Sequence, residues 1–391
     1  MSQASTDRDV TIFDTTLRDG EQAPGNGMSA RDKVAMAVRL EALGVDVIEI
    51  GFPASSANDY QAAMLARQAL TTATLATFSR CVESDIVKAV EAAGTDAHQI
   101  QLLATSSDLH LEHKRGISRA DCVREVVSAV RFARSLGVGN VSVGLEDATR
   151  GAPDLIRALV EKCVEAGATT VVAGDTSGCL LPAEYGDLIA AIRAYVPEET
   201  TVATHCHDDM GLALANALMG IQAGADQVQT TLGGVGERSG NTALEELAAV
   251  LAYKGTECGV RSKIKTEGIY DAYLELKSFM RLENVRNKAI VGVNAFATAA
   301  GIHQDGVLRK PETYEYLEPN RFGRERQLLV GRHSGRAILR YLLEKQDTIL
   351  DELMVTEIYN EFIASRMDND IETVEMLGNR IRSFMAMPAS E

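Results

Sequence analysis

The chain has 391 residues, of which 46% are hydrophobic and 24% are charged. This is the composition of an ordinary globular protein, and it excludes the disordered, collagen-like and low-complexity classes. The formal net charge of −16 at pH 7 makes the chain a poor partner for nucleic acids or anionic membranes. We therefore expect its partners to be small molecules, metal ions or further copies of the same chain.

The sequence also indicates a cytoplasmic protein. No apolar run approaches the roughly 18 residues of a membrane span, and the polar N-terminus carries no signal-peptide core. The six cysteines are scattered without CxxC spacing, which is typical of free thiols in a reducing compartment.

One pattern recurs along the first two thirds of the chain: a helical stretch ends in glycine, and a short apolar strand follows. Glycine past a helix end accepts the left-handed conformation that other residues resist. The glycines that carry this pattern are Gly44, Gly94, Gly137, Gly167 and Gly224. Adding expected strands at 10–13, 74–79 and 201–207 makes eight.

Eight strand–helix units in about 250 residues predict a (β/α)8 TIM barrel, which we place at residues 8–265. A doubly wound open sheet is the alternative. It fits less well because no GxGxxG motif follows the first strand.

The pattern changes after the predicted barrel, and residues 266–391 are expected to be a mainly helical extension. The segment 308–326 is too polar to pack alone. We expect either an extended arm that contacts the partner subunit or a mobile surface loop. The predicted helices of this extension lie at 270–282, 336–344, 347–365 and 371–386.

In a TIM barrel, functional residues gather at the rim where the strands end. His205 and His207 lie two residues apart at the end of the seventh strand, so they point to the same face. Two imidazoles on one face, with Asp19 after the first strand, favour a divalent metal over packed core histidines. With two nitrogens and no thiolate in reach, we expect Mg, Mn or catalytic Zn with open coordination positions.

Other strand ends carry further polar residues. GLEDATR and GDTSG place Glu146, Asp175 and Thr176 at the rim. Glu49 lies inside an apolar run, where a carboxylate needs a cationic partner, and Arg18 is the obvious candidate. For Glu49 and Asp175, a structural salt bridge is at least as good an interpretation as direct chemistry.

The last strand leads into a glycine-rich stretch, TTLGGVGERSGNTALEE at 230–246. Its glycines let the backbone approach a ligand closely, and the N-terminus of the helix that follows favours anions. We assign Gly234 and Gly236 to cofactor binding, with a plain turn as the alternative interpretation.

Six motifs carry a resemblance to a known family. Together they resemble the 2-isopropylmalate synthase family, which includes citramalate, methylthioalkylmalate and homocitrate synthases within the DRE-type metal-dependent aldolase-like barrels. The resemblance implies a Claisen condensation of acetyl-CoA with a 2-oxo acid, giving a 2-substituted malate and CoA. In chain order the motifs are DTTLRDGEQAPG, EIGFPASS, HCHDDMGLALAN, GGVGERSGNTALEE, GIHQDGVLRKPETY and VGRHSGR.

The resemblance also implies roles for single residues. Arg18 would neutralise the alkoxide that forms, and Thr176 would contact the substrate carboxylate. His303 would act in acid–base chemistry from the partner subunit of a homodimer, because it lies beyond the barrel, and Glu146 would orient it or complete the site. The family's metal-binding positions match Asp19, His205, His207 and Asn241.

The sequence departs from the family in two ways. The chain ends at residue 391, so we expect it to lack the leucine-binding regulatory domain of isopropylmalate synthases. Gly144 stands where the family tends to have Ser, and Val172 and Gly174 stand where it reads Asn and Pro. These changes remove volume and polarity and predict a bulkier, more apolar 2-oxo acid, unless changes elsewhere refill the space.

Homocitrate synthase, which takes 2-oxoglutarate, is the nearest alternative function. It needs a cation at the side-chain end of the pocket. The segment TSSDLHLEHKRG offers His110 as a substrate-binding candidate, with Lys114 and Arg115 close by. An acyl-CoA lyase of the same barrel group is less favoured because of the GIHQDG segment. A non-enzymatic regulatory protein is disfavoured by the intact set of site residues.

Overall fold

The computed structural model describes residues 8–345, 351–367 and 370–386. The chain divides into two compact units, Met1–Glu283 and Asn284–Glu391, which are described separately. Among the described residues, no helix combines the length and the apolar content that crossing a membrane requires.

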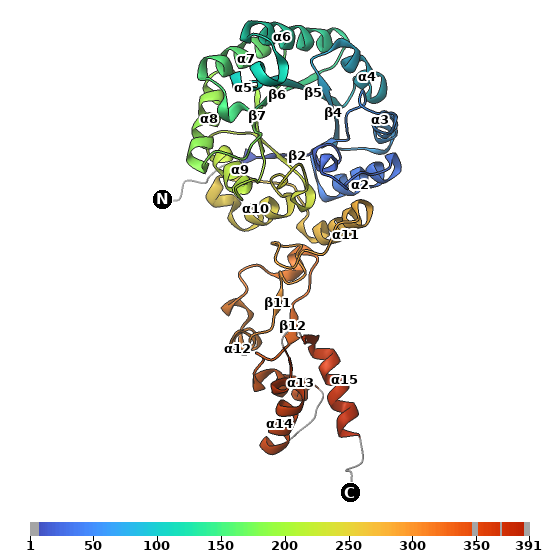
Figure 1. Ribbon diagram of the computed structural model, residues 1–391, viewed down its shortest axis with the longest axis vertical. Coiled ribbons are helices and arrows are strands. Elements are labelled where there is room, and N and C mark those ends of the chain that lie inside the picture. The colour runs from blue at the N-terminus through green and yellow to red at the C-terminus, as the bar shows by residue number, and fades with distance from the viewer. Residues whose placement is uncertain (1–7, 346–350, 368–369, 387–391) are drawn as a thin grey trace. The chain divides into compact units, whose positions relative to one another are not determined.

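The first unit is a closed barrel of eight parallel strands, which confirms the predicted TIM barrel (Figure 1). The ring closes where the first strand of the barrel pairs with the last, with Thr11 opposite Gln227. The strands are β2 (Thr11–Asp14), β3 (Val47–Glu49), β4 (Thr74–Arg80), β5 (His98–Thr105), β6 (Asn140–Glu146), β7 (Thr170–Asp175), β8 (Thr201–Cys206) and β9 (Gln227–Thr230).

Helices form an outer ring around these strands (Figure 1). The main apolar core lies between strands and helices, where side chains such as Ile100, Val141 and Leu159 are fully buried. The five glycines of the recurring pattern all have positive φ, as predicted. The ring helices are α2 (Ala30–Leu43), α3 (Ala57–Ala69), α4 (Glu83–Ala93), α6 (Arg119–Ser135), α7 (Pro153–Glu165), α8 (Pro182–Ala194), α9 (Ala213–Gln222) and α10 (Leu244–Cys258).

Helix α11 (Ile269–Met280) also belongs to the barrel unit. Its Ile269 and Leu276 are fully buried. On its exposed side, Arg39 of α2 forms ion pairs with Asp271 and Glu275. The unit therefore ends at Glu283 and not at the predicted boundary of residue 265, because the amphipathic face of this helix packs on the barrel.

In its described residues, the second unit has four α-helices and a small three-stranded sheet that the sequence analysis did not predict. Predicted helices at 336–344 and 371–386 correspond to α13 and α15. Of the helix predicted at 347–365, residues 347–350 lie outside the described residues; α14 starts after its N-cap Asp351, and a π-helical turn at Asn360–Ala364 follows it. The elements are β11 (Ala297–Thr298), α12 (Gly301–Arg309), β12 (Gln327–Val330), α13 (Arg336–Lys345), α14 (Glu352–Tyr359), β13 (Glu372–Thr373) and α15 (Val374–Met385).

The segment 308–326, for which we expected an extended arm or a mobile surface loop, has local helical structure. It contains 3-10 turns at Pro311–Thr313 and Pro319–Phe322. Phe322 is fully buried, and Glu315 and Arg326 form an ion pair with 2.5 Å between Oε1 and Nε. The Phe322 ring stacks on that of Phe296, and Arg324 donates to the carbonyls of Ile290 and Gly292, so these residues hold the segment onto its own unit, while the ion pair links two parts of the segment itself. Its contact with a partner subunit stays a prediction.

Candidate metal centre and active site

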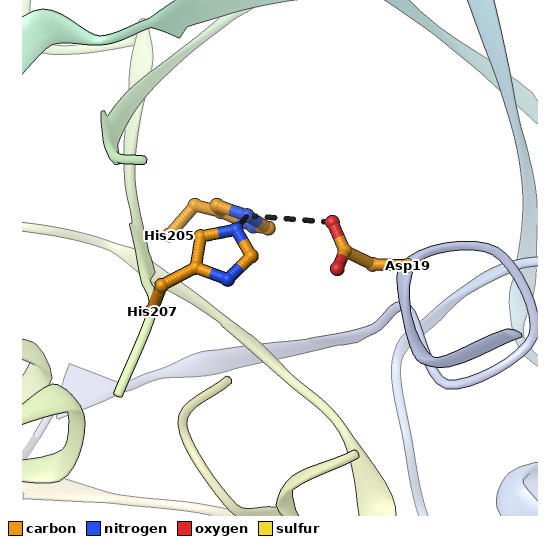
Figure 2. Close-up of side chains that lie close together, drawn as sticks. All are labelled: Asp19, His205 and His207. Carbon is orange, nitrogen blue, oxygen red and sulfur yellow. Dashed lines mark hydrogen bonds and ion pairs between the residues drawn. The ribbon is translucent and has the colours of Figure 1, made fainter. Parts of the chain in front are cut away.

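Three predicted metal ligands lie together at the rim of the barrel, where β2 and β8 end (Figure 2). Asp19 opens the short helix α1 (Asp19–Gln22), and His207 directly follows β8, which carries His205. The Nε2 atom of His205 lies 3.4 Å from Nε2 of His207 and 3.7 Å from Oδ2 of Asp19. Strand direction and loop length therefore bring residues almost two hundred positions apart to one point.

The charge states of these side chains suit a metal. Burial alone would raise the pKa of Asp19, but Arg18 and the two imidazoles outweigh it and hold that pKa well below its usual range. Burial lowers the pKa of His205 to about 4 and also lowers that of His207. The site thus offers one carboxylate and two neutral imidazoles, the protonation states that metal ligands require.

The geometry also fits one divalent ion. Two ligands about 2.1 Å from an ion are separated by roughly 3.0–3.4 Å in tetrahedral or octahedral coordination, which is close to the donor spacing here. Asn241, the predicted fourth position, donates from Nδ2 to Oδ1 of Asp19 over 3.0 Å. Its own Oδ1 is buried and has no hydrogen-bond partner among the described residues. Such an unpaired buried acceptor is expected where a ligand is to bind.

Two glutamine side chains that the sequence analysis missed hold His205 in place. Oε1 of Gln229 can only accept, so Nδ1 of His205 donates to it over 2.8 Å and Nε2 stays free for a metal. Nε2 of Gln229 in turn donates to Oε1 of Gln101 over 2.9 Å. Both glutamines are buried inside the barrel. A partner of this kind fixes the tautomer and ring orientation of a ligating histidine.

We predict that Gln229→Leu weakens metal binding about 10- to 100-fold, the usual cost of losing such a partner. Isothermal titration with Mn²⁺ measures the effect. Gln99→Leu is the matched control, because Gln99 is a buried glutamine on the same strand as Gln101, whereas the hydrogen bond to Nδ1 of His205 comes from Gln229. Equal metal affinity in the wild type and Gln229→Leu would contradict the assignment.

Arg18 joins the metal site to a buried carboxylate. Its Nη1 donates to Oδ2 of Asp19, and its Nε donates to Oε2 of Glu49, each over 2.8 Å. The guanidinium lies 4.9 Å from the ring centroid of Phe78. The predicted pairing of Glu49 with Arg18 is therefore confirmed, and Glu49 acts by positioning Arg18.

Buried Lys33 fixes the loop that carries Arg18 and Asp19. Its side chain is fully buried and forms ion pairs with Glu21 of α1 and Asp59 of α3. Asp59 also accepts from the backbone N–H of Phe52, in the loop after β3. Lysine is almost never fully buried without such partners, so this cluster ties two rim loops together.

A cavity of about 320 Å³ opens beside the metal ligands. Its wall combines the charged site with apolar side chains from Phe78, Leu103, Leu145 and Val172. Lining residues that the sequence analysis did not assign include Gln101, Lys114, Gln229 and Arg238. The predicted residues on its wall are Arg18, Asp19, Gly144, Glu146, Val172, Gly174, Thr176, His205 and His207.

Glu146 is engaged by residues of the segment after β5. Its Oε1 accepts from Nζ of Lys114 over 2.6 Å, and its Oε2 lies 3.6 Å from Nδ1 of His110. His110 is not among the cavity-lining residues and contacts Glu146 and Asp147 instead. The structure thus places His110 beside Glu146, whereas the sequence analysis expected it on the substrate.

Asp175 and Thr176, at the end of β7, differ in their surroundings. Asp175 is fully buried and accepts hydrogen bonds from Cys179 N–H and the Asn216 amide, which is a structural role. The Thr176 hydroxyl lines the cavity and accepts from the backbone N–H of Asp147 over 2.9 Å. Thr176 is therefore placed to contact a substrate, while Asp175 is not.

The glycine-rich loop frames Asn241. Gly236 has φ +150°, and a Cβ there would collide with the Asn241 amide and lie 3.2 Å from Oδ1 of Asp19. The carbonyl of Gly234 accepts from the backbone N–H of Asn241 over 3.1 Å. Gly236 therefore allows close packing against Asn241 and Asp19, and Gly234 holds the backbone of Asn241. Their assignment to cofactor binding stays a prediction.

His303 lies in the second unit, on α12. Its side chain is exposed, and its ring centroid is 4.3 Å from that of Tyr314. The role of His303 at the barrel site stays a prediction.

Comparisons with known proteins identify the family. Residues 9–275 match the HMGL-like family, and residues 290–369 match the homocitrate synthase post-HMGL domain-like family. A 2-isopropylmalate synthase of Xylella fastidiosa (strain M23) is 41% identical over 359 residues, which cover 90% of this chain and 69% of that protein. One from Syntrophus aciditrophicus is 40% identical and covers 92% and 70%.

Solved structures agree on the fold. The hydroxymethylglutaryl-CoA lyase of Pseudomonas aeruginosa superposes with a TM-score of 0.62 and 20% identity, covering 74% of this chain and 97% of that one. At this identity the likeness shows a shared barrel alone, whereas the matches at about 41% span both units. The chain therefore belongs to the 2-isopropylmalate synthase and homocitrate synthase family.

Proposed function

We propose that this protein is an acyltransferase that condenses acetyl-CoA with a 2-oxo acid to give a 2-substituted malate and free CoA. In this reaction the acyl group becomes an alkyl group on transfer. The observation that carries the proposal is the group of Asp19, His205 and His207 beside Arg18 in one cavity. Membership of the family at about 41% identity supports it.

The residues of the site divide the chemistry between them. Asp19, His205 and His207 would hold a divalent ion, which would supply a Lewis acid for the keto group of the 2-oxo acid. Arg18 places a guanidinium next to Asp19, where it stabilises the alkoxide that forms on the former keto oxygen. Thr176 contributes a hydroxyl on the cavity wall for the substrate carboxylate.

A base must remove a proton from the acetyl methyl group, because this group is a weak acid. We infer that His303 of a partner subunit takes this proton and that Glu146 orients it. The carbanion carbon then forms the new bond to the keto carbon, and water hydrolyses the thioester to release CoA. This assignment requires a homodimer.

The cavity favours an apolar side chain on the 2-oxo acid. A Cβ on Gly144 would have the carbonyl oxygen of Leu102 as its nearest neighbour, at 3.7 Å, so the space beside Gly144 is open. Val172 and Leu103 add apolar surface. Gly174 contributes differently, because a Cβ there would lie 2.8 Å from the carbonyl oxygen of Leu145. Close packing of β7 on β6 thus requires glycine at position 174.

A panel of 2-oxo acids, with release of free thiol from acetyl-CoA as the readout, tests the proposal. We expect 4-methyl-2-oxopentanoate or phenylpyruvate to exceed 2-oxoisovalerate and pyruvate in kcat/KM. Gly144→Ser should shift this ratio about 10-fold towards the smaller acids, since a methylene-sized change is worth about 1–3 kcal/mol. Gly139→Ser is the control, because a Cβ at Gly139 meets no atom within 4 Å. An unchanged ratio in Gly144→Ser would contradict this pocket.

Homocitrate synthesis remains the second candidate, because residues 290–369 match the domain named after it. The charged residues that line the cavity disfavour a dicarboxylate substrate. The three lining cations already have carboxylate partners: Arg18 pairs with Asp19 and Glu49, Lys114 with Glu146, and Arg238 with Asp209. Burying a further charge without a partner is costly. If 2-oxoglutarate is the best substrate in the panel, homocitrate synthase is the function.

A further inference from the structure

A second cavity of about 330 Å³ adjoins the active-site cavity in the barrel unit. The two share Leu103, Lys114 and Glu146 on their walls. We call the second cavity the side chamber. It lies between the loop after β4, which contributes Cys81 and Val82, and the segment after β5. The function proposed above makes no use of it.

The two cavities meet at Leu103, Lys114 and Glu146, which we call the partition. Leu103 pairs with Gly144 on β6, which has no side chain, and with Arg80 on β4, which lines the side chamber. The rest of the partition is the ion pair of Lys114 and Glu146, and the Lys114 side chain is 49% exposed. A lysine on a flexible four-carbon stem can turn its ammonium towards water, and the Glu146 side chain, which is 14% exposed, keeps the imidazole of His110 3.6 Å from its Oε2.

The walls of the side chamber suit an uncharged apolar group. Burial raises the pKa of the Cys81 thiol, so Cys81 stays neutral, and its Sγ donates to the carbonyl of Leu103 over 3.3 Å. The charged lining groups are already paired. Arg115 forms a salt bridge with Glu125 at 2.8 Å, and Arg80 forms one with Asp85 at 2.6 Å. A charged ligand would therefore gain little there.

We propose that the side chamber receives the far end of the 2-oxo acid's side chain. The substrate class is then a 2-oxo acid with a long unbranched or aryl-terminated tail, which passes over Gly144 and displaces Lys114 from the partition. The inference rests on the proposed function and extends it. The active-site cavity must also hold the acetyl group, so a second volume of similar size decides how long a tail fits.

The test reduces the volume of the side chamber by placing larger side chains on the part of its wall that it does not share with the active-site cavity. Cys81→Phe and Val82→Trp add bulk at two positions that line the side chamber but not the active-site cavity. We expect kcat/KM for 2-oxooctanoate and 2-oxo-4-phenylbutanoate to fall about 10- to 200-fold, with pyruvate and 2-oxoisovalerate unchanged. Cys258→Phe is the control, because Cys258 is a partly buried cysteine at the end of α10, outside both walls.

Two variants keep the test decisive if one fails to fold, since Val82 is 43% exposed and tolerates a larger side chain. The inference is overturned if the folded variants keep the wild-type preference for long tails, or if the wild type turns over short acids but not long ones. Failure of the proposed function looks different, because the wild type would then release no CoA with any 2-oxo acid.

Discussion

Replacing Asp19 with alanine is expected to abolish condensation and to remove the metal. Asp19 is the only carboxylate in the three-residue ligand group of the described chain, and its charge offsets that of the ion. Lewis-acid polarisation contributes several kcal/mol to the transition state, so we expect a loss of at least about 1,000-fold in kcat/KM. His207→Ala should behave in the same way, because it removes another of few ligands.

The measurement combines metal content after dialysis with the rate of CoA release. The wild type should also gain thermal stability from added Mn²⁺, because a ligand that binds only the folded state stabilises it, and Asp19→Ala should not. Asp209→Asn is the control, because Asp209 lies at the same rim but pairs with Arg238 and lies outside the ligand group. An Asp19→Ala protein that keeps both its metal and its activity would rule out this site.

The barrel could be predicted because five of its eight strands follow a glycine in a fixed pattern. A glycine in the left-handed conformation ends one helix. The apolar run after it is too short to form a second helix, so it predicts a strand. The Arg18–Glu49 pair could be predicted for a similar reason. A carboxylate in a buried apolar run needs a cation, and the motif after β2 supplied one.

The sequence analysis missed the glutamine side chains inside the barrel, although their spacing along the sequence indicates them. Gln99 and Gln101 alternate along β5, and Gln227 and Gln229 alternate along β9. In a strand covered on both faces, polar residues two apart share the face that points into the barrel. This alternation indicates a polar layer beneath the rim, and Gln101 and Gln229 form the part of it that holds His205.

The structure of the second unit was harder to predict because it depends on a few individual side-chain contacts. The strands β11 and β13 have two residues each, which is too short to show any alternation. In the polar segment 308–326, burial of Phe322 and the Glu315–Arg326 pair decide the fold. The composition gives the average polarity of such a segment and does not show which aromatic ring becomes buried.

The second large effect concerns His303. If it serves the barrel of the partner subunit, His303→Ala and Arg18→Ala are each inactive, yet their mixed dimer should recover activity. One barrel of that dimer keeps Arg18 and receives an intact His303, while the other barrel has neither. Random mixing makes about half of the dimers mixed, each with one working site, so about a quarter of the wild-type activity should return.

Co-expression with two different affinity tags isolates the mixed dimers and removes the need to refold either chain. The control pairs Arg18→Ala with Asp19→Ala. Both changes damage the barrel itself, so neither site in this mixed dimer is whole and no activity should return. Recovery with His303→Ala but not with Asp19→Ala assigns His303 to the opposite barrel. Inactive double-tagged dimers of His303→Ala and Arg18→Ala would show that His303 acts within its own subunit, and an active His303→Ala homodimer would show that it has no part in the reaction.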